Sequence, residues 1–378
     1  MNNDLAERLL AKVMNWSPED IAMERPMIQA LSLYKYDEYQ QFSPGMRFIE
    51  SLALWLSQFD LNERKIAYEF VKSQIIFISN AEMTHLISIA YSDYIRPIIM
   101  QQVATKLNIS ELCPTRISGT KEFKTLLRQS LFLGLSDGAH IDTFRRSNPN
   151  ISNEQIWQTY EISHNKAHDM KKELEKDLET KILSRPPNNE EVKFRMIFLL
   201  DDFSGSGISY FRKDLRKNRP TGKIKKIIGR FAGVNGDEHD LQSIVNLDDL
   251  QIWVILAVST NQAIERLQNT TTEWLRDEGL NIKINITAIQ IIPESVKIDP
   301  KRQDGIVNLL MKYFDSDVID GHYQKGRYEK PFLGFDECAL PLILSHNTPN
   351  NSLPLLWFEP SQSKYHGLFP RVSRHKEE

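Results

Sequence analysis

The sequence has little cysteine and no long apolar run. Its 378 residues include only Cys113 and Cys338, too few for a disulfide framework and not in metal-ligand spacing. The N-terminus lacks the composition of a secretory signal peptide, and no apolar segment approaches the roughly eighteen residues of a membrane span. We therefore expect a cytoplasmic protein that makes no use of a membrane.

The chain also lacks a dominant charge. It has 47 Lys and Arg against 50 Asp and Glu, a formal net charge of −3. This balance predicts no general attraction to nucleic acid or to anionic lipid. An apolar content of 41% and a charged content of 26% are ordinary for a globular protein. The length allows two or three domains with their own cores.

Glycine is nearly absent from the first part of the chain, where Gly45 is the only one before Gly119. Apolar residues such as Phe48 and Leu52 recur there at helical spacing. We expect an all-helical N-terminal domain over residues 1–110. It is either a docking or regulatory module or a structural cap on the domain that follows.

The most informative stretch is residues 196–209, which read M-I-F-L-L-D-D-F-S-G-S-G-I-S. The five leading apolar residues are too few for an ordinary helix and suit a strand buried on both faces. The carboxylates of Asp201 and Asp202 follow, then a turn of glycines and serines, and the apolar pattern from Ile208 to Leu215 predicts a helix. Strand, turn and helix together predict part of a doubly wound parallel sheet, whose ligands bind outside the carboxyl ends of the strands.

The turn combines residues suited to the two ends of a phosphorylated sugar. Gly205 and Gly207 permit positive φ and leave no Cβ between backbone and ligand, so that N–H groups can point at a phosphate. Ser206 and Ser209 can add hydroxyl donors. The two aspartates are acceptors, which suit sugar hydroxyls or a hydrated Mg²⁺. The pattern predicts a site for a phosphorylated ribose, and the alternative is a plain strand-to-helix turn with capping residues.

This stretch resembles the phosphoribosyl-diphosphate (PRPP) loop of type I phosphoribosyltransferases. In that family, four or five apolar residues precede two acids and a T-G-G-T-like phosphate cradle. By position, Asp201 and Asp202 match the acid pair that holds the ribose hydroxyls. Ile208 stands where the family usually has its second glycine, which is a departure from the pattern. Ser206, Gly207 and Ser209 match the first Thr, the first Gly and the last Thr.

The resemblance implies an α/β fold of the type I phosphoribosyltransferase kind, a doubly wound parallel sheet preceded by the helical domain. It implies that Mg²⁺ enters with PRPP or a nucleotide, without a direct metal ligand from the protein. In an active enzyme the acid pair would position the ribose and oppose the positive charge that develops at its anomeric carbon. The phosphate-binding segment implied by the resemblance consists of Ser204, Gly205, Ser206, Gly207, Ile208 and Ser209.

A second strand and turn precede this stretch. Leu131 to Leu135 predict a buried strand, and in type I phosphoribosyltransferases an earlier strand ends in a short loop that contacts the pyrophosphate of PRPP. The resemblance places this loop at Ser136, Asp137, Gly138 and Ala139, with an ordinary β-turn as the alternative. Arg145 and Arg146 follow, and they either grip a phosphate in bidentate geometry or form a solvated surface pair.

Charged segments flank the 196–209 stretch. In residues 148–189 a helix is predicted to begin around Gln155, Trp157 and Tyr160 and to continue into a segment rich in Lys and Glu. Its place in the chain implies a lid over PRPP, as in the resembled family. Residues 212–249 are first basic and then acidic. The basic part, 212–230, is either a nucleic-acid or acidic-partner surface or, as we favour, a solvated face balanced by the acids, because no aromatics interleave.

The last third of the chain predicts three more strands. Residues 250–258 and 282–292 bracket a helix and extend the parallel sheet, and residues 339–344 form a final strand. The polar loop after it carries the candidates for recognising a nucleobase, with a rigid packed turn as the alternative. These candidates are His346, Asn347 and Asn350.

The whole pattern resembles the phosphoribosyltransferase-like proteins of bacterial conflict systems, in which a helical region precedes a divergent phosphoribosyltransferase domain, here residues 111–378. This resemblance implies a PRPP- or nucleotide-binding regulatory protein of an anti-phage defence or toxin–antitoxin system. Its implied partner is a protein encoded nearby, such as a RecQ-like helicase toxin. The alternative is an active Mg²⁺-dependent phosphoribosyltransferase or a nucleotide-consuming effector enzyme.

Overall fold

The chain forms two compact units. A computed structural model describes residues 3–159, 162–214, 219–233, 241–302, 305–358 and 365–372. Unit 1 comprises Met1–Glu82 with Pro293–Glu378, and unit 2 comprises Met83–Ile292. Unit 1 therefore contains both ends of the chain, whereas the boundary expected near residue 110 separated the N-terminal helices from everything after them.

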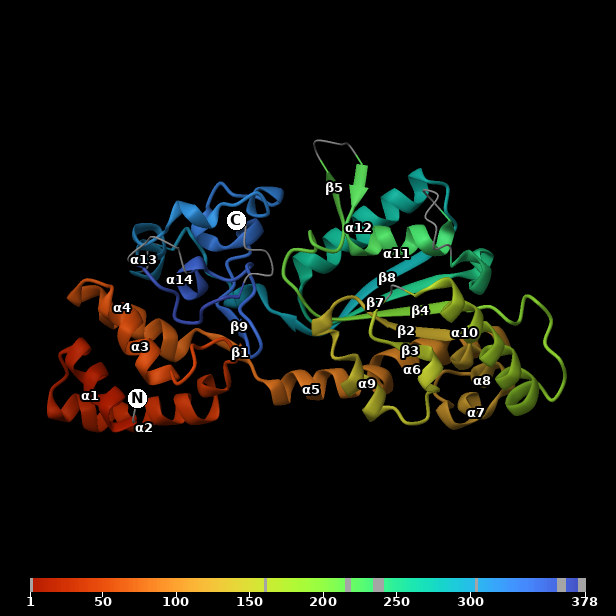
Figure 1. Cartoon of the computed structure of the whole chain (residues 1–378), viewed down its shortest axis with the longest axis horizontal. Coiled ribbons are helices and arrows are strands. Elements are labelled where there is room, and N and C mark those ends of the chain that lie inside the picture. The colour runs from red at the N-terminus through yellow and green to blue at the C-terminus, as the bar shows by residue number, and fades with distance from the viewer. Residues whose placement is uncertain are drawn as a thin grey trace. The chain divides into compact units, whose positions relative to one another are not determined.

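Unit 2 is built on a five-stranded sheet in which every pair of neighbours is parallel (Figure 1). The strand order is β3-β2-β4-β7-β8, with β4 at the centre. This confirms the predicted α/β class and the buried central strand. The strands are β2 (Ser130–Gly134), β3 (Ile156–Trp157), β4 (Met196–Ser204), β7 (Gln251–Thr260) and β8 (Lys283–Ile292).

The order of the strands creates a switch point beside β4. From β2 the chain crosses to β3 on one side and then returns to β4 on the other side of β2. In open parallel sheets, ligands bind at the carboxyl edge where the direction of crossing reverses. Residues 136–139 leave the end of β2 and residues 201–209 form the end of β4, so both predicted loops lie at this edge.

Helices cover the sheet of unit 2. The core between them contains side chains of α10, α11, α12 and the inner strands. Further helices precede β2 or follow it closely, and α5 (Asn80–Ile89) spans the boundary between the units. The helices are α6 (Arg96–Leu107), α7 (Pro114–Gly119), α8 (Lys121–Arg128), α9 (Ile141–Ser147), α10 (His164–Asp177), α11 (Lys223–Ala232) and α12 (Asn261–Asp277). No helix within the described ranges is both long and apolar enough to cross a membrane.

Residues 148–189, for which a lid was expected, contribute structural elements to the sheet. Ile156 pairs with Phe132 of β2, so the helix predicted to start at residues 155–157 is wrong there, and Tyr160 lies outside the described residues. Helix α10 then connects β3 to β4. Its Met170 and Leu174 are fully buried in the core of the sheet, so one face of this charged helix packs rather than meeting water.

The helix predicted directly after the glycine–serine turn is also wrong. β5 (Arg212–Asp214) pairs antiparallel with β6 (Arg219–Thr221), and α11 begins only after this hairpin. Pro220 lies within β6, and Gly222 after it has a φ of +122°. Neither residue is compatible with a continuing helix.

Unit 1 combines the N-terminal helices with C-terminal segments, and it confirms the predicted helical N-terminal region. Residues 76–78 pair in parallel with residues 342–344, so the predicted final strand does not extend the five-stranded sheet. The ring of Phe369 lies 5.2 Å from that of Tyr36, which joins the two ends of the chain in one core. The elements are α1 (Asn3–Met14), α2 (Pro18–Tyr34), α3 (Phe48–Ser57), α4 (Leu61–Ser73), β1 (Ile76–Ile78), α13 (Gly305–Lys312), β9 (Leu342–Leu344) and α14 (Pro354–Trp357).

Candidate functional site

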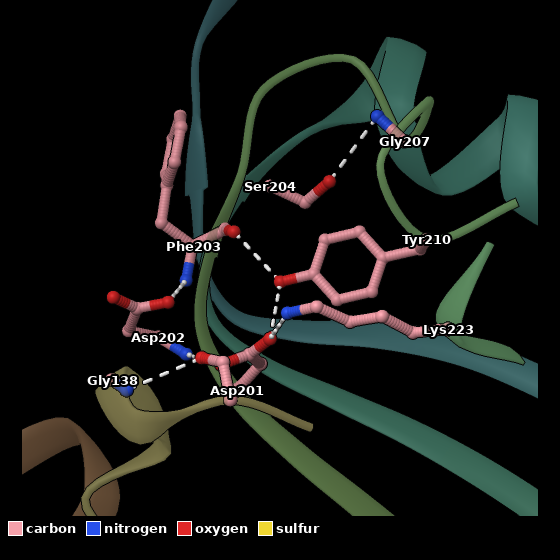
Figure 2. Close-up of polar contacts among 9 residues, drawn as sticks. Gly138, Asp201, Asp202, Phe203, Ser204, Gly207, Tyr210 and Lys223 are labelled. Atoms are coloured by element: carbon pink, nitrogen blue, oxygen red, sulfur yellow. Dashed lines mark hydrogen bonds and ion pairs between the residues drawn. The ribbon is translucent and has the colours of Figure 1, made fainter. Parts of the chain in front are cut away.

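The carboxylate of Asp201 is the centre of a polar cluster at the end of β4. It is fully buried, and Figure 2 shows side chains from separate segments converging on it. The hydroxyl of Tyr210 donates to Oδ2 at 2.7 Å, and the ammonium of Lys223 lies 3.2 Å from the same oxygen. The hydroxyl of Ser136, in the turn after β2, donates to Oδ1. Asp201 therefore joins the ends of β2 and β4 to the start of α11.

The groups around Asp201 have opposite effects on the pKa of its carboxyl group. Burial raises the pKa of Asp201, and the neighbouring charge of Asp202 raises it further, whereas Lys223, Ser136 and Tyr210 act in the lowering direction. Burial and the two carboxylates raise the pKa of Tyr210 well above its usual value. Tyr210 thus stays protonated and serves as a donor to Asp201.

Asp202 lies closer to solvent and against the turn after β2. Its side chain is half-buried, and its Oδ1 accepts the backbone N–H of Phe203 at 2.7 Å. A Cβ atom placed on Gly138 would lie 2.5 Å from Oδ2 of Asp202. Gly138 is part of a 3₁₀ turn over Asp137–Ala139, and its N–H donates to Oγ of Ser136. The turn after β2 and the acid pair therefore form one cluster.

Gly138→Ala should test whether this close approach matters for ligand binding. The new methyl group would displace the Asp202 carboxylate, which is the end of a side chain and can turn away. We expect less than about 1 kcal/mol of lost stability, but about tenfold weaker binding of PRPP in the presence of Mg²⁺, a factor worth about 1.4 kcal/mol. Calorimetric titration and thermal unfolding would measure the two effects. Unchanged affinity would show that the turn and Asp202 do not bind the ligand jointly.

The glycine–serine turn is stabilised by hydrogen bonds between its own residues and by packing against α12. Gly207 has a φ of +78°, and a Cβ there would lie 2.8 Å from Cγ of Leu267 on α12, so both conformation and packing require glycine. The N–H of Gly207 donates to Oγ of Ser204, and the N–H of Ile208 donates to Oγ of Ser206. These serine hydroxyls therefore stabilise the backbone of the turn.

The carbonyl groups of the turn are bound to β7 and α12. Ser259 donates to the carbonyl of Ser204 at 2.9 Å, Thr260 donates to that of Gly205 at 2.7 Å, and Arg266 donates to that of Ser206 at 2.8 Å. Three successive carbonyls are thus satisfied on one side of the backbone. Ser204, Gly205, Ser206, Gly207 and Ile208 are buried, whereas Ser209 is exposed.

Sequence reasoning missed Tyr210 and Lys223 as members of this cluster. Lys223 reaches Asp201 because the β5–β6 hairpin returns the chain to the end of β4. At the end of the hairpin, a Cβ on Gly222 would lie only 2.4 Å from the carbonyl oxygen of Tyr210. The glycine before a basic helix was the available signal, but the predicted continuous helix concealed it.

The other candidates in unit 2 are two arginines on α9 and the basic segment 212–230. Arg145 and Arg146 on α9 are exposed, and Arg146 forms an ion pair with Asp142 at 3.4 Å. In the basic segment, Arg230 donates to the carbonyl of Ile162 at 2.7 Å. Residues 215–218 and 234–240, with several of the cations and acids of the 212–249 region, lie outside the described residues.

The candidates for nucleobase recognition belong to unit 1, where their loop is packed. The side-chain amide of Asn347 donates to the carbonyl of Val372 and accepts the backbone N–H of the same residue. Gln41 donates to the carbonyl of His346 at 2.7 Å, and the carbonyl of Asn350 accepts the N–H of Phe335. These contacts hold the loop within unit 1, and a role of its residues in nucleobase recognition stays a prediction.

The possible metal ligands of the chain and its similarity to known proteins bear on the chemistry of the site. In the part of the chain that the structure describes, no group of three or more His, Cys, Asp and Glu residues could hold a metal ion. The family model described as PRTase-CE matches residues 52–371. No curated protein and no solved structure matches the chain.

Proposed function

Because the chain belongs to the PRTase-CE family, we propose that its phosphoribosyltransferase-like fold binds PRPP or a nucleotide at the carboxyl ends of β2 and β4. The observation that carries this proposal is the contact between the two turns. Ser136 donates to Asp201, and Gly138 packs against Asp202. A ligand at this edge would meet an acid pair and two glycine-containing turns together, which matches the sugar and phosphate ends of a phosphorylated ribose.

The two aspartates would have different roles. Asp202 is half-buried, whereas Asp201 is fully buried, so the carboxylate of Asp202 is the one that a ribose hydroxyl can reach. Asp201 is buried beneath it and bonded to Tyr210 and Lys223. In the proposed complex Asp201 positions the two turns and Asp202 contacts the sugar.

Mg²⁺ fits this donor set as a companion of the ligand. Phosphate oxygens and water would form the shell of the ion, and the half-buried Asp202 carboxylate could accept hydrogen bonds from that water. When bound, the ion would neutralise charge on the diphosphate. The residues of the chain would hold the sugar and orient the phosphates.

We favour a regulatory role over turnover, in which ligand binding controls a protein partner in an anti-phage defence or toxin–antitoxin system. The supporting observations are the buried and internally bonded turn and Ile208, which stands where the resembled enzymes have glycine. A partner of the helicase-like toxin kind remains part of this proposal. The second candidate, an active transferase or nucleotide-consuming effector, is favoured by the acid pair itself, because carboxylates can oppose an oxocarbenium-like charge.

Binding and turnover of PRPP by the full chain would test both candidates. Saturable binding in calorimetry with Mg²⁺, without release of pyrophosphate in the presence of common bases, would support the regulatory role. Release of pyrophosphate that depends on Asp202 would support the enzyme. Neither binding nor turnover with PRPP or nucleotides would overturn the proposed function.

Asp202→Asn should weaken PRPP binding about a hundredfold or more. The amide keeps the shape of the side chain but loses its charge and one acceptor for the sugar hydroxyl or Mg²⁺, and about 2.7 kcal/mol corresponds to this factor. Asp248→Asn is the matched control, because Asp248 is exposed and precedes β7 at the opposite end of the strands. Equal affinity of the two variants would contradict a role for Asp202 in binding.

A further inference from the structure

Helix α2 of unit 1 exposes an apolar stripe. Met23, Met27, Leu33 and Tyr34 are 73%, 50%, 70% and 82% exposed. Ala22, Pro26 and Ala30 on the same helix are exposed as well. Residues 23, 27, 30 and 34 follow the i, i+4, i+7, i+11 spacing, so they form one line along the helix, roughly 16 Å long at about 1.5 Å per residue. Such a continuous exposed apolar stripe marks an interaction surface.

The charged side chains in the middle of α2 are used within unit 1 instead. Glu24 accepts from the hydroxyl of Tyr68 at 2.6 Å and from the ammonium of Lys72 at 3.1 Å. Arg25 pairs with Glu7 at 2.6 Å and also reaches Asp4 on α1. Glu24 and Arg25 therefore bond to α4 and α1 of their own unit and Ile28 packs into its core, while the apolar stripe faces solvent.

We propose that this stripe is the contact surface of a homodimer, in which α2 packs antiparallel against α2 of a second copy of the chain. A two-fold axis near the middle of the stripe brings the same residues of both copies into one contact. It pairs Met23 with Tyr34 of the second copy and Met27 with Ala30 of the second copy. The long Met27 then faces the small Ala30 in both halves, so the two helices can approach closely.

The charges at the ends of the stripe fit the antiparallel arrangement. Glu19 and Asp20 lie in the first turn of α2, and its last turn contains no basic residue. The ammonium of Lys35, which follows the helix, donates to the carbonyl of Ile75 within unit 1. Parallel packing would bring the acids of the two copies together, whereas antiparallel packing places them at opposite ends of the contact. The opposed helix dipoles add to the same preference.

The size of the surface predicts a reversible dimer. One helix face buries less than the roughly 800 Å² per partner of a standard interface, so we expect dissociation in the micromolar range. Residues 52–371 match the family model, so α2 lies outside the matched part of the chain. The dimer contact lies in unit 1 and the proposed ligand site in unit 2, so the dimer is tested without ligand.

Sedimentation of the full chain at about 1 to 100 μM would test the dimer. We expect the mass to rise from monomer to dimer over this range. Met23→Glu with Met27→Glu should weaken the dimer at least tenfold, because two carboxylates from each copy would be buried at the contact. Leu112→Glu is the control, since Leu112 is 90% exposed but lies in unit 2. A wild-type chain that stays monomeric, or a double variant that dimerises like wild type, would overturn the proposal.

Cysteine cross-linking would test the direction of packing. The variants Met23→Cys and Tyr34→Cys are made in a Cys113→Ser background, because Cys113 is exposed, whereas Cys338 is buried. We expect disulfide-linked dimers when the two variants are mixed and oxidised, and few when either is oxidised alone. Efficient cross-linking of one variant with itself, or none in the mixture, would exclude the antiparallel contact.

Discussion

Gly222→Ala is expected to reduce the free energy of unfolding by about 2–6 kcal/mol. The φ of Gly222 is +122°, a conformation that costs other residues about 1–3 kcal/mol. The new Cβ would also lie 2.4 Å from the carbonyl oxygen of Tyr210 and 2.9 Å from Cα of Phe211. These are backbone atoms that cannot swing aside, and overpacking of this kind adds about 1–3 kcal/mol.

Denaturant unfolding would measure this loss, with Gly279→Ala as its control. Gly279 belongs to the same unit and also has a positive φ, +66°, but a Cβ there meets nothing within 4 Å. Gly279→Ala should therefore cost only about 1 kcal/mol, from backbone strain alone. Equal losses for the two variants would mean that the contact between Gly222 and Tyr210 does not hold the hairpin against the site.

The sheet of unit 2 was largely predictable because its inner strands are buried on both faces. Such strands are apolar runs, and the predicted 250–258 corresponds to β7 at Gln251–Thr260. The edge strand β8 at Lys283–Ile292, predicted at 282–292, instead alternates buried and less buried residues over most of its length. β4 extends through the acid pair to Ser204, farther than its apolar residues indicate. The extension is stabilised by pairing of Ser204 with Ser259, which no local pattern of residues reveals.

Features that depend on distant segments were not predictable in the same way. Whether residues 342–344 join the central sheet or pair with residues 76–78 depends on which edge is reached in the folded chain. Gln155, Trp157 and Tyr160 suggested the start of a helix, and only the pairing of Ile156 and Trp157 with β2 makes these two residues a strand. Short apolar segments carry too little periodicity to decide between these outcomes.

The candidate site shows the same division. The acid pair and the glycine–serine turn follow one another in the sequence, and the turn at residues 136–139 follows a predicted strand, so each could be identified there. The burial of Asp201 and its bonds to Tyr210 and Lys223 depend on a hairpin that interrupts an apparent helix. Sequence reasoning could therefore name the carboxylates but could not distinguish the buried one from the one near solvent.

Lys223→Met is expected to reduce the free energy of unfolding by about 2–3 kcal/mol at neutral pH, because it leaves the buried Asp201 without the cation that pairs with it. Breaking a fully buried ion pair costs about 3–5 kcal/mol. The side chain of Lys223 is 30% exposed, so water replaces part of the interaction and lowers the expected cost. Lys226→Met on the same helix is the control, since Lys226 is exposed.

The loss should depend on pH in a direction set by Asp201. Lys223 lowers the pKa of this carboxyl, so removing the lysine raises the pKa further above the usual value of 3.8. A carboxyl with a raised pKa in the folded state favours folding below its unfolded pKa, and this advantage disappears as pH rises through the folded pKa. The difference between Lys223→Met and wild type should therefore be smallest near pH 4 and grow toward pH 7.

Unfolding measured across this range, with the double variant Asp201→Asn with Lys223→Met, would separate charge from packing. The amide that replaces the Asp201 carboxylate carries no charge at any pH, so the double variant should recover most of the stability at pH 7 and lose the pH dependence. Asp202 is present in every variant, and Tyr210 stays protonated, so the difference between variants reports Asp201. A loss that is the same at pH 4 and pH 7 would instead assign the effect to packing of the lysine stem against the ring of Tyr210, whose centroid lies 5.0 Å from the ammonium.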